Sequence, residues 1–69
     1  MNKKQFVVNY LTPMLKALNE RIDYCDYLIT QYDSEYVEIV YQNGYRKRVN
    51  VTADSNYAIA VDVLRSGGF

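Results

Sequence analysis

The sequence predicts a small α+β domain in the order α-β-β-α, with a two-stranded antiparallel hairpin covered on one face by helices. Three observations lead to this fold class. Apolar residues recur at helical spacing over residues 3–32, two β-rich runs flank Asn43-Gly44, and a second helical pattern follows Asp54. We expect a single domain, 1–69, with helices near 3–11 and 13–31, a hairpin over 35–52 and a helix over 54–66.

The amino-terminal part of the chain carries the longest apolar stripe. Thr12-Pro13 interrupts the stripe, and this pair predicts a helix start because threonine can cap a helix and proline is favoured at the first helical position. The alternative is one long helix kinked at Pro13. The stripe consists of Val7, Leu11, Met14, Leu15, Leu18, Ile22, Cys25, Leu28, Ile29 and Tyr32.

The hairpin is predicted from Asn43-Gly44, a strong short-range turn signal. A two-residue loop would mix apolar and polar side chains on both faces, whereas a three-residue loop over 42–44, with Gly44 left-handed as a bulge, gives one apolar face. In that register Glu38 lies opposite Arg48, a favourable cross-strand pair. The apolar face holds Val37, Ile39, Tyr41, Tyr45, Val49 and Val51, and Lys47 is the exception.

The last helix is predicted to begin after Asp54 or Ser55, either of which can serve as its N-cap. We expect its apolar side to face the hairpin, and we expect Gly67-Gly68 to provide a left-handed stop with Phe69 folding back onto the helix. The apolar side consists of Tyr57, Ala60, Val61 and Leu64, with Ile59 and Val63 alongside.

Composition restricts the class of protein. A single cysteine, Cys25, excludes an internal disulfide and fits a reducing compartment. No apolar run approaches the roughly 20 residues of a membrane span, and the amino end lacks the apolar core of a signal peptide. We therefore expect a cytoplasmic protein.

Catalytic chemistry has little support in the sequence. There is no histidine, which removes the commonest general base and metal ligand at neutral pH. Cys25 lies on the apolar stripe, and the spacing of Asp23 and Asp26 brings no further carboxylates towards them. No glycine pattern resembles a phosphate-binding loop. The sequence thus predicts a protein that is not an enzyme and has no metal or cofactor.

A two-stranded hairpin leaves two open strand edges and one uncovered face. Natural proteins rarely leave such edges unmanaged. Pairing of two copies edge to edge, or back to back through Tyr36 and Val40, would cover them, so we expect a homodimer. The alternative is a monomer in which Arg46 and Arg48 protect the edge.

The acidic segment 20–38 provides the candidate surface for a protein partner. On a helix over 13–31, Tyr24 and Tyr27 would lie away from the apolar stripe, beside Glu20 and Asp23. Exposed tyrosines are enriched among interface hot spots, and the carboxylates would steer a basic partner. The alternative is that these tyrosines pad a junction between helices or between subunits.

The basic run Tyr45-Arg46-Lys47-Arg48 gives a second candidate function, binding of nucleic acid. Arginines at alternate positions of a hairpin can follow a phosphate backbone, and tyrosines can stack on bases. Three cations are few for this purpose, and the isoelectric point of about 6.1 is low for a small nucleic-acid-binding domain. We therefore rank this function below protein binding.

The carboxy-terminal half contains the stretches 43–45 (NGY), 49–55 (VNVTADS), 58–59 (AI) and 62–64 (DVL). In these stretches it resembles short, uncharacterised proteins of phages and integrative elements in Gram-positive bacteria. The resemblance carries over no catalytic or binding residue. It implies no established activity, but short phage proteins often bind a host protein and block or redirect it, and we expect the same of this chain.

Overall fold

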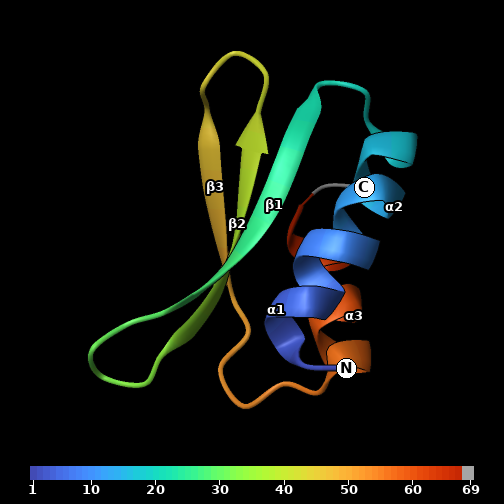
Figure 1. Ribbon diagram of the computed structural model, residues 1–69. Coiled ribbons are helices and arrows are strands. Elements are labelled where there is room, and N and C mark those ends of the chain that lie inside the picture. The colour runs from blue at the N-terminus through green and yellow to red at the C-terminus, as the bar shows by residue number, and fades with distance from the viewer. Residues whose placement is uncertain (68–69) are drawn as a thin grey trace.

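The computed structural model describes residues 1–67, and within them the chain folds as a three-stranded antiparallel sheet with helices on one face (Figure 1). The sheet order is β1-β2-β3. The α+β class is confirmed, but the predicted two-stranded sheet is wrong because a third strand precedes the hairpin. The elements are α1 (Lys3–Phe6), η1 (Val7–Leu11), α2 (Thr12–Leu18), β1 (Ile22–Ile29), β2 (Glu35–Tyr41), β3 (Arg46–Asn50) and α3 (Asn56–Ser66).

The predicted helix over 13–31 is wrong beyond Leu18, because Ile22–Ile29 forms β1. A β-bulge between Ile22 and Tyr24 explains the misleading pattern. The extra residue of a bulge puts Ile22 and Cys25, three positions apart, on the same buried face, and this spacing imitates a helix. Isoleucine and tyrosine are also typical strand residues.

The amino-terminal helix is continuous over residues 3–18, so the alternative of one long helix describes this part of the chain better than two separate helices. Its middle section, η1, is a π-helical turn in which the Thr12 N–H donates to the Val7 carbonyl, five residues back. Pro13, which has no N–H to donate, comes directly after this turn at the start of α2. The wide turn therefore accommodates the proline inside the helix.

The β2–β3 hairpin has the predicted three-residue loop. The Tyr41 N–H donates to the Tyr45 carbonyl at 2.8 Å, and the Gly44 N–H donates to the Tyr41 carbonyl at 2.9 Å. Gly44 has φ +87°, a left-handed conformation that favours glycine. The register places Glu38 opposite Arg48, as predicted.

One core lies between the helices and the sheet. The long helix contributes three buried side chains spaced four residues apart, and the sheet contributes side chains from all three strands. Its members are Val7, Leu11, Leu15, Ile22, Cys25, Tyr27, Val37, Ile39, Val49, Val51, Ile59 and Val63.

The last helix, α3, begins as predicted but packs through a different face. The Ser55 hydroxyl accepts a hydrogen bond from the Ala58 N–H at 3.2 Å, so Ser55 and not Asp54 caps the helix. Tyr57, predicted to face the hairpin, is exposed, and Ile59 is buried. Gly67 has φ −78°, so the left-handed stop predicted there is wrong. The predictions for Gly68 and Phe69 lie outside the described residues.

A membrane-crossing helix is absent from residues 1–67: none of their helices has the length and apolar character required.

The burial of Ile39 gives a test of the fold. Ile39→Ala should lower the free energy of unfolding by about 2–4 kcal/mol, and Val49→Ala by somewhat less, because each leaves a cavity under the helices. Urea denaturation followed by circular dichroism measures the loss. Ile29→Ala is the matched control, since that side chain is 62% exposed. A loss below about 0.5 kcal/mol at Ile39 would contradict its burial.

Candidate functional site

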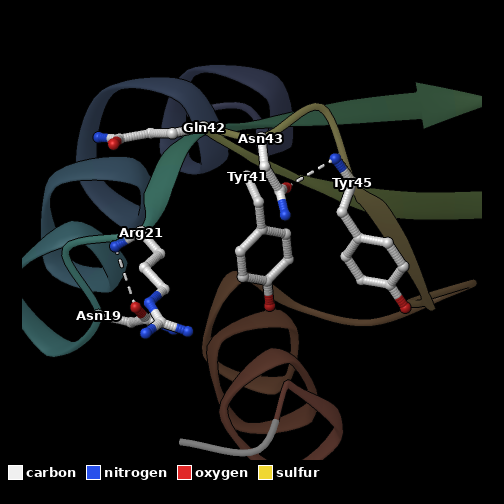
Figure 2. A pocket seen from close by; sticks show the side chains of 6 residues that line it. All are labelled: Asn19, Arg21, Tyr41, Gln42, Asn43 and Tyr45. Carbon is white, nitrogen blue, oxygen red and sulfur yellow. Dashed lines mark hydrogen bonds between the residues drawn. The ribbon is translucent and has the colours of Figure 1, made fainter.

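A hollow of about 420 Å³ lies where the α2–β1 turn meets the β2–β3 turn. We call it the tyrosine pocket, after the two aromatic rings that project into it in Figure 2. Residues from both turns and from the end of β2 line it. They are Asn19, Arg21, Tyr41, Gln42, Asn43 and Tyr45.

Backbone and side-chain hydrogen bonds hold the two turns together. The Gln42 N–H donates to the Arg21 carbonyl at 2.8 Å, which ties the hairpin to the α2–β1 turn. Within the turns, Asn19 accepts from the Arg21 N–H, and Asn43 accepts from the Tyr45 N–H, each at 3.0 Å. The pocket is therefore built on fixed backbone even though most of its residues lie in turns.

The two tyrosine rings form the apolar part of the pocket. Their centroids are 5.5 Å apart and their planes are inclined by 49°, an arrangement typical of aromatic pairs. Tyr41 is half-buried and packs on the core, whereas Tyr45 is 60% exposed. One ring is thus anchored, and the other offers its face to a ligand.

Arg21 supplies the positive charge of the pocket. Figure 2 shows its side chain on the same side of the hairpin as the two rings. Within residues 1–67 Arg21 forms no ion pair, so its guanidinium is free to bind a carboxylate. Aromatic faces, phenol hydroxyls, amides and one guanidinium suit binding of a polar segment. They offer no general base at neutral pH.

The face of the sheet opposite the helices, which we call the open face, carries an ion cluster around the buried carboxylate of Glu38. Arg46 Nη1 lies 2.6 Å from Glu38 Oε1, and Arg48 Nε lies 3.1 Å from Glu38 Oε2. Glu38 is only 8% exposed. Hydrogen bonding by Arg48, followed by that of Arg46, keeps the pKa of Glu38 below its ordinary value. Both arginines are therefore already engaged with a carboxylate.

The other residues of the predicted nucleic-acid surface are divided between the two faces. Tyr45 and Lys47 alternate with the two arginines, so they project on the helix-covered side, and Tyr45 belongs to the tyrosine pocket. The four residues Tyr45, Arg46, Lys47 and Arg48 thus do not form one basic surface.

The residues predicted to bind a protein partner do not share a surface, because they lie in a turn and a strand and not on a helix. Glu20 and Asp23 are exposed on either side of Arg21 in the chain. Tyr24 is exposed on the open face opposite Val40. Tyr27 is only 9% exposed and faces the core. Its side chain is therefore part of the interior, and binding through the other three remains a prediction.

Tyr27 belongs to a polar cluster centred on Glu35. The Glu35 carboxylate accepts hydrogen bonds from Lys3 Nζ at 2.7 Å, from the Tyr27 hydroxyl and from the Ala53 N–H at 2.7 Å. These bonds, with that of Lys3 the strongest influence, lower the pKa of Glu35 to about 2. Burial and the neighbouring carboxylate raise the pKa of Tyr27 to about 12. The cluster joins several elements and is structural.

Two other polar features lie nearby without forming a site. The neighbouring carboxyl of Asp62, together with burial, raises the pKa of Asp54. Burial raises the pKa of the Cys25 thiol, which contacts the Thr12 hydroxyl at 3.1 Å, so the thiol is not activated. Within residues 1–67 no group of three or more cysteine or carboxylate side chains is arranged to hold a metal ion.

Sequence reasoning placed Tyr41 and Tyr45 on one face but did not include Asn19, Arg21 or Gln42 in a site. The tyrosine pair could be predicted because a three-residue loop places both side chains on the same face of the hairpin. The other pocket residues could not be predicted, because the α2–β1 turn was expected to lie inside a helix.

Comparisons with protein-family models, with curated proteins and with solved structures give no match to this chain. Function must therefore be argued from the geometry.

The lowered pKa of Glu35 makes stability depend on pH in acid. A carboxylate whose pKa is lowered on folding stabilises the fold above its ordinary pKa of 4.5, and the stabilisation is lost as the pH falls towards about 2. Unfolding in urea should show that wild type is more stable than Glu35→Gln at pH 6. The difference should shrink between pH 4.5 and 2. A difference independent of pH in this range would contradict the cluster.

Self-association through Tyr36 and Val40 also remains a prediction. Tyr36 is half-buried on the open face, and Val40 is only 5% exposed, so the apolar area offered there is small. Sedimentation equilibrium at micromolar concentration should show about twice the chain mass of 8.1 kDa if two copies pair. A single mass of 8.1 kDa at all concentrations would contradict the dimer.

Proposed function

We propose that this chain is a small non-enzymatic protein-binding module and that it contacts its partner through the tyrosine pocket. The observation that carries the proposal is the convergence of Tyr41, Tyr45 and Arg21 from two turns. Tyrosine and arginine, with tryptophan, are enriched among interface hot spots.

The pocket suits protein recognition because its parts are already ordered. Tyr41 packs on the core, and the Gln42 N–H to Arg21 carbonyl bond holds the two turns in place. Ordering a flexible side chain on binding costs roughly 0.5–1.5 kcal/mol, so a pre-ordered aromatic pair loses less free energy on association. Glu20 and Asp23 flank Arg21 in the chain and would give the same contact region groups of opposite charge.

The biological setting follows from the resemblance to short proteins of phages and integrative elements. We infer that the chain acts in the bacterial cytoplasm and that it inhibits or redirects a host protein. A domain of 69 residues with ordered aromatic groups on its surface is sufficient for such a role, because blocking a partner requires only binding.

Binding of nucleic acid is the less favoured function. Arg46 and Arg48 share the Glu38 carboxylate, Lys47 projects on the other face, and the formal net charge of the chain is zero. Affinity for nucleic acid depends on several phosphate contacts, and this surface offers few cations for them. A gel shift in low salt tests this function, and a clear complex there would favour it over protein binding.

A pair of exposed tyrosines allows a matched test of the protein-binding function. Tyr45→Ala combined with Arg21→Ser should reduce capture of a partner from Gram-positive cell lysate by tenfold or more, ~1.4 kcal/mol. Tyr32→Ala is the control, because Tyr32 is 82% exposed in the β1–β2 turn at the opposite end of the sheet (Figure 1). Thermal midpoints should be nearly unchanged in both variants. Equal capture by the two variants would contradict the pocket as the contact region.

A further inference from the structure

The two edges of the sheet differ in whether a helix contacts them. At the β1 edge, the Thr12 hydroxyl accepts from the Cys25 N–H at 3.2 Å and lies 3.3 Å from the Cys25 carbonyl oxygen, so the long helix blocks this edge at Cys25. β3 lies at the other edge, away from the long helix (Figure 1). Within residues 1–67 the β3 edge therefore has no helix beside it, whereas the β1 edge is blocked at Cys25.

The hydrogen-bond register identifies the free groups of β3. The Val51 N–H donates to the Glu35 carbonyl, and the Tyr41 N–H donates to the Tyr45 carbonyl. The backbone N–H and C=O groups of the odd-numbered residues of β3 therefore point towards β2. Residues alternate in an antiparallel ladder, so the N–H and C=O groups of Arg46, Arg48 and Asn50 point away from the sheet. In the described part of the chain these outward groups have no backbone partner.

Positive charge surrounds this edge. Arg46 and Arg48 project on the open face and Lys47 on the other, and Glu38 is the carboxylate that both arginines contact. The other carboxylate of the open face, Asp26, lies on β1 and pairs with Lys4 at 3.6 Å. The side chains of Arg46 and Arg48 remain 56% and 58% exposed. The cluster keeps a positive excess, because one carboxylate cannot neutralise two guanidinium groups.

Like charge disfavours a second copy of the chain at this edge. Antiparallel pairing of β3 with itself, centred on Arg48, overlaps all of residues 46–50 and places Arg48 opposite Arg48. A shift of two residues one way places Arg46 opposite Arg48, and the other way overlaps only residues 48–50, with Arg48 opposite Asn50. Like charges directly opposite each other destabilise a strand pair. The edge therefore disfavours self-pairing and favours a strand of opposite charge.

We propose that the β3 edge binds an extended acidic segment of a partner protein as an added fourth strand. The segment would run antiparallel to β3 and would bond to the outward backbone groups of Arg46, Arg48 and Asn50. Its carboxylates would lie opposite the two arginines. Addition of a strand to an open edge gives affinity through the main chain and specificity through alternate side chains. This surface is separate from the tyrosine pocket and goes beyond the function proposed for it.

The geometry fixes which peptide groups matter. Residues directly opposite Arg46 and Arg48 form the hydrogen-bonded pairs of the ladder, so the same peptide residues carry the carboxylates and turn their N–H groups towards β3. A capped seven-residue peptide of alternating glutamate and threonine is therefore the probe. N-methylation of its glutamates removes donors that face β3, and N-methylation of its threonines removes donors that face away.

Fluorescence anisotropy with the labelled peptide and the intact protein tests the proposal. The glutamate–threonine peptide should bind, a lysine–threonine peptide should bind at least tenfold more weakly, and N-methylation of the glutamates should weaken binding at least tenfold. N-methylation of the threonines should change affinity less than twofold. Amide hydrogen exchange by NMR should slow at Arg46, Arg48 and Asn50 but not at Lys47.

A protein variant gives an independent reading. Arg48→Gln should lower the affinity for the acidic peptide, whereas Arg65→Gln on α3, also an exposed arginine, should not. The N-methylated peptides keep the test decisive if Arg48→Gln is unstable, because they are used with the wild-type chain. No binding at millimolar peptide, or equal binding of both N-methylated peptides, would overturn the proposal. Either result would leave the capture experiment on the tyrosine pocket unaffected.

Discussion

The arrangement of the domain depends on the carboxylate of Glu35. It is the first residue of β2, and it accepts hydrogen bonds from α1 through Lys3, from β1 through Tyr27 and from the turn before α3 through the Ala53 N–H. Ala53 has φ +63°, a conformation that is unfavourable for a residue with a side chain. The bond to Glu35 helps to hold this turn, which returns the chain to the helix-covered face. One half-buried anion thus joins the two helical segments to the sheet that they cover.

The hairpin could be predicted because the residues that determine its geometry are close together in the sequence. Asn43-Gly44 and the parity of the flanking side chains select one loop length, and the Glu38–Arg48 pair follows from it. β1 could not be predicted in the same way. Its partner is β2, and its bulge spaces Ile22 and Cys25 like residues on a helix. Because of the bulge, the apolar residues of β1 continue the spacing of the apolar residues in the preceding helix. Periodicity alone therefore assigned β1 to that helix.

The same error hid the tyrosine pocket. Once β1 pairs with β2, the α2–β1 turn must lie beside the end of the hairpin, and Arg21 comes next to Tyr41. The sequence predicted the two tyrosines on one face, but a site needs both turns, and their meeting is a property of the sheet order. The sequence also predicted only one of the two ion pairs on β3. Glu38 was expected to pair with Arg48, yet it also binds Arg46.

The long helix and β3 solve the problem of strand edges by different physical means, and this difference has consequences for function. The helix covers the β1 edge by contact: the Thr12 hydroxyl replaces a neighbouring strand at Cys25. β3 stays uncovered and is protected by charge, because Arg46, Lys47 and Arg48 repel a second copy of the same strand. Contact by the helix excludes any added strand at Cys25, whereas protection by charge excludes only partners of like charge. An edge protected in the second way is therefore still selective for an acidic strand, and the ion cluster around Glu38 holds its arginines in place without removing their positive excess.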